Sequence, residues 1–225
     1  MIFRILTIFP GLFTNFLQES IIGRAVSRNI IDIHLTDIRN FAKDKHRTVD
    51  DYPYGGGPGM VMKPEPLHDA INSLKRKREI PVIYFTPQGK LLDQKLVNEY
   101  GKYQELILVC GHYKEIDQRI RETLISDEIS IGDYVVSGGE LPSMIFIDAL
   151  TRIQPGALND IESALTDSHQ NGLLGYPYYT RPPEFKGMKV PEVLLSGNHQ
   201  KIEEWRKAKA REITKKNRPD LLKNE

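Results

Sequence analysis

Short apolar runs alternate with amphipathic stretches through the first two thirds of the chain. The apolar, β-branched runs of strand length are residues 2–9, 31–38, 81–86, 106–110 and 129–136. Stretches with helical periodicity lie between several of them, as at residues 64–78 and 91–100. Strands that alternate with helices form sheets that are buried on both faces. The pattern therefore predicts an α/β fold with a largely parallel sheet and helices on both faces.

The last third of the chain is organised differently. Residues 141–153 have apolar positions at helical spacing, and Pro155 and Gly156 end that helix. A polar, weakly periodic stretch follows, then a segment rich in proline and aromatic residues, and then a helical pattern at residues 196–216. We predict a main domain, a flexible linker and a small helical domain. Their boundaries are residues 1–160, 161–175 and 176–225.

Composition indicates the class of protein and its cellular compartment. The chain has 225 residues and one cysteine, Cys110, so an intramolecular disulfide is excluded and a reducing compartment is expected. The six histidines match no zinc-binding spacing. Arg4 and Pro10 interrupt the apolar start, which favours a buried strand over a signal peptide. No window approaches the roughly 18 apolar residues of a membrane span, so we expect a soluble cytoplasmic protein without membrane association.

Charge is distributed unevenly along the chain. The whole chain has a net charge of +1, whereas residues 181–225 carry 12 Lys and Arg against 7 Asp and Glu. A basic C-terminal part on a mildly acidic body indicates a polyanionic partner. A solvated, charged helix explains the same composition equally well.

Three apolar runs are followed by polar, glycine-bearing turns: PQGK after residues 81–86, GHYKEID after 106–110, and DYVVSGGE after the run that starts at residue 129. Ligands of open α/β sheets bind beyond the carboxyl ends of the strands. Neither glycine motif for nucleotide phosphates occurs, and Asp117, Asp133 and Glu140 would repel a phosphate. The turns suit a cationic ligand read by backbone groups, and S-adenosylmethionine has that chemistry.

Several long motifs together resemble one family. They are TPQGK (86–90), CGHYKEID (110–117), SIGDYVVSGGELPSM (130–144), DDYPYGGGPGM (50–60), DSHQNGLLGYPYYTRPPEF (167–185) and VPEVLLSGNH (190–199). In this order, over essentially the whole chain, they resemble the bacterial tRNA (guanine-N1)-methyltransferases of the SPOUT superfamily. The resemblance implies a deep trefoil knot over roughly residues 84–142, a homodimer with its active site between subunits, and a helical C-terminal domain that binds tRNA.

The resemblance also implies the reaction and its residues. The enzyme would transfer a methyl group from S-adenosylmethionine to N1 of the guanosine on the 3′ side of the anticodon, position 37 of tRNA, which protects the reading frame. Asp167 would act as general base and Arg152 would stabilise charge on guanine O6. The residues implied for the methyl donor are Tyr84, Thr86, Pro87, Gly89, Gly111, Glu115, Ile131, Gly132, Tyr134, Val136, Gly138, Gly139 and Pro142.

A further set is implied for the anticodon stem-loop. Its members are Asp50, Gly57, Gly59, Ser168, Arg181, His199 and Arg206. The resemblance also associates Mg²⁺ with the reaction, although no cluster in this sequence has ligand spacing for it. From the residues alone, Asp167 could be a polar linker residue or helix cap, and Arg152 could pair with Asp148.

The chain departs from the family pattern in one loop. Where the family has C-G-R-Y-E-G, this chain has His112, Lys114 and Glu115 in place of arginine, glutamate and glycine. An ammonium beside a cationic donor is unfavourable unless Glu115 supplies the missing charge. The chain also ends earlier than many relatives. Two other interpretations stay open: methylation of a different RNA nucleoside, and a knotted RNA-binding protein that has lost catalysis.

Overall fold

The computed structural model describes residues 1–75, 80–158 and 167–222. They divide into two compact units, Met1–Ile161 and Glu162–Glu225, which are described separately. Part of the expected linker, residues 161–166, lies outside the described residues, so its flexibility stays a prediction. In the described part of the chain, no helix is both long and apolar enough to span a bilayer.

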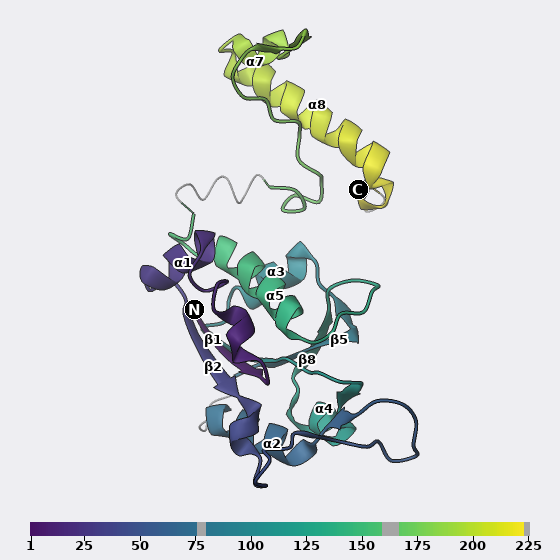
Figure 1. The fold of residues 1–225 in the computed structure, drawn as a ribbon. Helices are drawn as coiled ribbons and strands as arrows, with labels where there is room; N and C mark the ends of the chain where they lie inside the picture. The colour runs from purple at the N-terminus through teal and green to yellow at the C-terminus, as the bar shows by residue number, and fades with distance from the viewer. Residues whose placement is uncertain (76–79, 159–166, 223–225) are drawn as a thin grey trace. The chain divides into compact units, whose positions relative to one another are not determined.

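The first unit is built on a five-stranded sheet (Figure 1). Its strands are β1 (Ile2–Thr7), β2 (Asp32–Asp37), β5 (Val82–Leu91), β6 (Glu105–Val109) and β8 (Asp127–Ser130). The strand order is β2-β1-β6-β5-β8, and every neighbouring pair is parallel. The α/β fold with a largely parallel sheet is confirmed.

Alternating side chains of the strands build two cores, one on each face of the sheet. In β6, Leu106 and Leu108 point to one core, and Ile107 and Val109 point to the other. The first core is covered by α1 (Ser20–Ser27), α3 (Gln94–Tyr100) and α5 (Glu140–Arg152). The second is covered by α2 (Pro64–Lys75) and α4 (Gln118–Leu124), as Figure 1 shows.

Short elements complete the first unit. Two 3₁₀ helices, η1 (Pro10–Phe13) and η2 (Ile38–Phe41), follow β1 and β2. A small second sheet has the order β3-β4-β7 and consists of β3 (Asp50–Asp51), β4 (Val61–Met62) and β7 (Glu115–Ile116). It connects the glycine-rich segment after β3 with the loop that follows β6.

The described part of the second unit combines a short hairpin with helices. A hairpin of β9 (Glu184–Phe185) and β10 (Met188–Lys189) precedes α7 (Glu192–Leu195), α8 (His199–Asn217) and η3 (Pro219–Leu222). Asn198 caps α8, because its side-chain oxygen accepts a 3.1 Å hydrogen bond from the Lys201 amide. The Leu174 amide donates to Thr214 Oγ1 at 2.9 Å, which fastens the segment before the hairpin to α8.

Two sequence predictions about the strands were wrong. The strand predicted at residues 81–86 does not end in a turn, because β5 continues to Leu91 along β8 after a register shift between Phe85 and Lys90. The strand predicted at residues 129–136 ends at Ser130. There the Ser130 hydroxyl accepts a hydrogen bond from the Gly132 amide and donates one to its carbonyl, which forms a tight turn. Residues 131–139 consequently form a loop.

Candidate functional site

A pocket with about 630 Å³ of empty volume lies at the ends of β6 and β8, beside the part of β5 where its register with β8 shifts. Its walls come from residues 84–87 of β5, from residues 111–115 after β6, from the loop that follows β8, and from Pro142 in α5. Carboxyl ends of parallel strands meet at one edge of a sheet, which explains why segments far apart in the sequence line one pocket.

The structure brings together the residues predicted for the methyl donor, with one exception. Those that line the pocket are Tyr84, Thr86, Pro87, Gly111, Glu115, Ile131, Gly132, Tyr134, Val136, Gly138, Gly139 and Pro142. Gly89 does not line it, because it lies further along β5 beside the backbone of Glu128 and Ile129. Sequence reasoning did not assign Ser130, Val135 and Ser137 to the site. Their position inside the motif 130–144 was the available signal.

Two glycines permit the close approach of the segments that form the pocket. A Cβ at Gly139 would lie 2.6 Å from the Cα of Cys110, and its amide donates a 2.9 Å hydrogen bond to the Gly111 carbonyl. A Cβ at Gly111 would lie 2.7 Å from the Tyr84 ring. Any larger residue at these positions would separate the loop after β8 from the end of β6.

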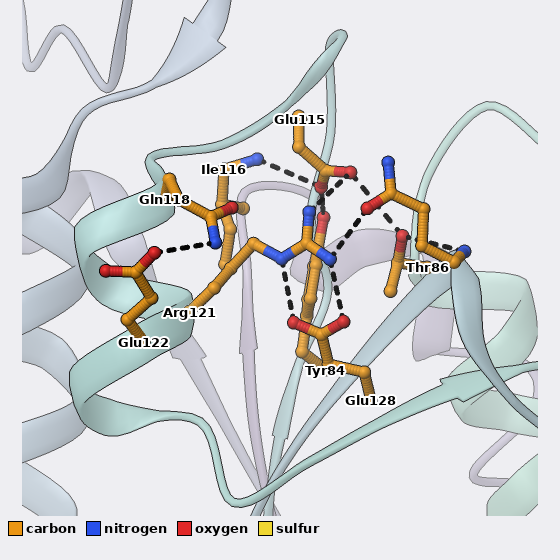
Figure 2. A network of polar contacts seen from close by, with 9 residues as sticks. Tyr84, Thr86, Glu115, Ile116, Gln118, Arg121, Glu122 and Glu128 are labelled. Carbon is orange, nitrogen blue, oxygen red and sulfur yellow. Dashed lines mark hydrogen bonds and ion pairs between the residues drawn. The ribbon is translucent and has the colours of Figure 1, made fainter.

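Glu115 is at the centre of a polar cluster beside the pocket (Figure 2). Its Oε1 accepts a hydrogen bond from the Tyr84 hydroxyl and another, of 3.2 Å, from the Ile116 amide. Its Oε2 accepts a 3.4 Å hydrogen bond from the Thr86 hydroxyl. Burial, together with the negative charge of Glu115, raises the pKa of Tyr84 well above its usual value. The phenol therefore stays protonated and acts as a donor to the carboxylate.

Arg121 of α4 bridges Glu115 to a second carboxylate. Its Nε and Nη2 each lie 2.7 Å from an oxygen of Glu128, and its Nη1 lies 3.3 Å from Glu115 Oε2. The Arg121 side chain is 8% exposed. The hydrogen bonds to Glu128, together with the charges of both carboxylates, raise the pKa of Arg121 despite its burial. The guanidinium is therefore a permanent cation in this cluster.

None of the three acids predicted to repel phosphate lines the pocket. Asp117 caps α4 and is paired with Arg119 at 2.8 Å, and Asp133 is absent from the pocket walls. Glu140 is 2% exposed and accepts a 2.7 Å hydrogen bond from Thr7, while His112 Nε2 lies 3.5 Å from its other oxygen. The carboxylate of Asp117 is occupied by helix capping and that of Glu140 by core contacts. Among the described residues that line the pocket, Glu115 is the acidic one.

The predicted catalytic residues lie in different units. Arg152 is in the last turn of α5, ten residues after Pro142, and it is not among the pocket-lining residues. That spacing places it about 15 Å along the helix axis from Pro142. Asp167 is exposed in the second unit, and its negative charge contributes to the raised pKa of Tyr178, after burial and contacts with Tyr176.

Two of the predicted tRNA contacts of the first unit adjoin the pocket-lining loop. Asp50 of β3 hydrogen-bonds Tyr113, whose pKa is raised by burial and by that contact. A Cβ at Gly59 would lie 3.5 Å from Lys114 Cβ, whereas Gly57 has open space around it. The glycine-rich segment thus runs beside residues 113–114, next to the donor pocket.

The other predicted tRNA contacts are in the second unit. Ser168 accepts a 2.9 Å hydrogen bond from the Gly175 amide. Arg181 is exposed, and His199 is exposed at the first position of α8. Arg206 pairs with Glu203 at 2.6 Å and lies 5.0 Å above the Tyr176 ring. Arg206 therefore helps to fasten Tyr176 to α8 as well as being a predicted phosphate contact.

The chemistry of the pocket suits S-adenosylmethionine, whereas the described residues provide no metal site. Glycine-flanked backbone can approach an adenine closely, and the Glu115 carboxylate suits a cationic ligand. Among residues 1–75, 80–158 and 167–222, no group of three or more His, Cys, Asp or Glu side chains is placed to hold a metal ion.

The chain as a whole is similar to known proteins of one family. The model of the tRNA (Guanine-1)-methyltransferase TrmD family matches residues 1–224. A tRNA (guanine-N(1)-)-methyltransferase of Clostridioides difficile is 50% identical over 99% of this chain and 98% of its own length. Proteins of the same name from Caldanaerobacter subterraneus and Brevibacillus brevis are each 53% identical, over 99% and 97% of this chain and 92% and 90% of theirs. The chain belongs to the tRNA (guanine-1)-methyltransferase family.

Proposed function

We propose that this protein transfers a methyl group from S-adenosylmethionine to N1 of the guanosine on the 3′ side of the anticodon, position 37 of tRNA, and so maintains the reading frame. The observation that carries the proposal is the family match over residues 1–224. The pocket supports it, because motif residues from three separate segments meet there. We place the reaction in the cytoplasm, where tRNA is used.

Residues 84–142 are proposed to form a trefoil knot. The hydrogen bond from the Gly139 amide to the Gly111 carbonyl supports this, because it holds the loop after β8 against the end of β6. Knots are rare in proteins. The close backbone approach at Gly139 is the kind of contact that a tightly folded loop requires.

The active site is proposed to form between two copies of the chain. Arg152 and the donor pocket are at opposite ends of α5, so one copy of this unit does not bring them together. Leu141 and Ile145 are exposed on α5. Ile145 follows Leu141 by four residues and Arg152 follows Ile145 by seven, so the three side chains lie on the same helix face. A second copy that covers this apolar face would bury it and bring an arginine to the interface.

In the proposed mechanism, the chain prepares guanine for attack. The Asp167 carboxylate accepts the proton of N1, because the protonated nitrogen has no free electron pair for the new bond. Arg152 stabilises the negative charge that then develops on O6. When bound, S-adenosylmethionine supplies the methyl group, which leaves its sulfur as the bond to N1 forms. The pocket residues hold the donor in line with N1.

The second unit is proposed to bind the anticodon stem-loop, with residues 161–175 as a flexible connection. Its exposed residues Arg181 and His199 and the basic residues of α8 supply contacts to phosphates. Tyr178 and Tyr179 are 68% and 50% exposed and provide faces for an unstacked base. A Mg²⁺ requirement is not part of the proposal.

Methyl transfer to an unmodified tRNA transcript tests the function. With labelled S-adenosylmethionine, we expect incorporation into a transcript with guanosine at position 37 and none when adenosine replaces it. Mapping of the label to another nucleoside would favour the alternative acceptor. Donor binding in calorimetry without any transfer would favour the RNA-binding protein that has lost catalysis.

A further inference from the structure

Glu115 differs in charge and position from the other residues that surround the donor pocket. Of the described residues that line the pocket, it is the acidic one, and it also lines a second cavity beside residues 51–54. Its side chain is 24% exposed, so it is partly desolvated without being cut off from the pocket. A charge in this setting acts on a ligand more strongly than a charge at the surface.

The partners of Glu115 fix the orientation of its carboxylate. Hydroxyls of Tyr84 and Thr86 and the Ile116 amide all donate to its carboxylate. Three donors from separate positions hold the carboxylate in one orientation beside the pocket. Figure 2 shows the carboxylate between the strand that carries Tyr84 and the helix that carries Arg121.

Arg121 does not cancel the negative charge of this cluster. One guanidinium is shared between two carboxylates, and it is closer to Glu128, at 2.7 Å, than to Glu115, at 3.3 Å. Glu128 does not line the pocket. The cluster therefore has a net charge of −1, and its less compensated carboxylate faces the pocket. Lys114 also lines the pocket, but it is exposed, so solvent screens its ammonium group.

We propose that Glu115 is the residue by which this protein distinguishes the charged methyl donor from its uncharged product. This inference rests on the proposed function. S-adenosylmethionine has a sulfonium, whereas S-adenosylhomocysteine has a neutral thioether in its place and is otherwise the same apart from the methyl group. A partly buried carboxylate stabilises the first and has little effect on the second. The loss of charge on methyl transfer would then weaken binding of the product and favour its exchange.

Calorimetric titration of both ligands into Glu115→Gln tests the proposal. Glutamine keeps the shape and one acceptor oxygen for the Tyr84 hydroxyl, and it removes the negative charge. We expect affinity for S-adenosylmethionine to fall about tenfold, with affinity for S-adenosylhomocysteine changed less than twofold. The matched control is Glu122→Gln, which removes an exposed charge of α4 that neither contacts Arg121 nor lines the pocket. We expect it to leave the affinity ratio of the two ligands within about twofold of the wild-type value.

Three results would overturn the inference. They are an equal loss for both ligands in Glu115→Gln, no loss for either ligand, and an equal change of the ratio in Glu122→Gln. If the glutamine variant does not fold, Glu115→Ala is titrated instead with the same expected change in the ratio. Methyl transfer by the wild-type protein to the guanosine-37 transcript is measured in parallel. Transfer together with an unchanged ratio would reject the role of Glu115 and leave the proposed function standing.

Discussion

The Thr7 hydroxyl at the end of β1 donates a 2.7 Å hydrogen bond to the carboxylate of Glu140 in the first turn of α5, 133 residues further along the chain. Both residues are buried, with Glu140 2% exposed and Thr7 0% exposed. A carboxylate near a helix N-terminus is favoured by the helix dipole, yet it still needs partners when it is buried. The bond therefore joins the start of α5, which carries Pro142 of the pocket, to the end of β1.

Thr7→Val should destabilise the protein. Valine has almost the same shape but cannot donate to Glu140, so a buried carboxylate loses a partner. We expect the free energy of unfolding to fall by about 1–3 kcal/mol, measured by urea denaturation. Thr123→Val is the control, because Thr123 is exposed and its hydroxyl bonds only within its own helix. Equal effects of the two substitutions would contradict a special role for the Thr7–Glu140 contact.

Gly139→Ala should disturb both stability and the donor pocket. The added Cβ would lie 2.6 Å from the Cα of Cys110, so the loop after β8 has to move away from the end of β6. Overpacking of this kind costs about 1–3 kcal/mol, and we expect weaker binding of S-adenosylmethionine in calorimetry. Gly11→Ala is the matched control, since a Cβ there meets nothing within 4 Å. A Gly139→Ala protein with wild-type stability and donor affinity would show that the close approach is dispensable.

Asp117→Asn should change the dependence of stability on pH. The hydrogen bond from Arg119 holds the pKa of Asp117 below its usual value, although burial opposes this shift. The charged form therefore stabilises the fold above the unfolded pKa of about 3.9, and this contribution is lost as the pH falls through the lower folded pKa. Asparagine can still cap α4 but has no charge. We expect a loss of up to about 1 kcal/mol at pH 7, and a smaller difference from wild type at pH 3 in urea denaturation. A difference that grows at low pH would contradict this explanation.

Asp167→Asn should remove turnover and leave binding intact. Asparagine keeps the size and hydrogen-bonding capacity of the side chain, but it cannot accept the N1 proton. We expect single-turnover methylation to slow by about 100-fold or more, with donor and tRNA affinities within about threefold of wild type. Turnover near the wild-type rate would exclude Asp167 as the base.

Arg152→Ala should lower the rate by about 100-fold, because a group that stabilises charge in the transition state would be missing. Arg152→Lys is the companion variant and should recover part of the rate, since it keeps the charge but loses the planar guanidinium. Mixing Arg152→Ala chains with chains that carry Glu115→Gln, at a donor concentration too low to saturate the glutamine variant, tests the shared site. If each active site uses both copies, some mixed dimers contain one site with both residues intact, so the mixture should regain transfer. A mixture no more active than its two components would contradict a site formed between copies.

Individual segments show how far sequence patterns could be followed. The apolar runs that became β1, β2 and β6 were placed within two residues of their ends. A strand of a sheet that is covered on both faces is apolar along most of its length, so the run itself marks the strand. The glycine-bearing turn predicted at PQGK is instead part of β5. There the pairing with β8, a segment about 40 residues away, decides the conformation. The composition of residues 87–90 alone gives no information about this pairing with β8.

The sequence by itself determined the α/β class, the alternation of side chains between two cores, and the motif residues that line the pocket, since these follow from local periodicity and from the recognisable motifs. Only the tertiary structure decided which charges face that pocket. Glu140, Asp117 and Asp133 are absent from the described walls, whereas Glu115 is present, held by Tyr84 from β5 and Arg121 from α4. The physical reason is that the environment of a carboxylate is set by groups from distant segments, and these meet only after the strands have paired.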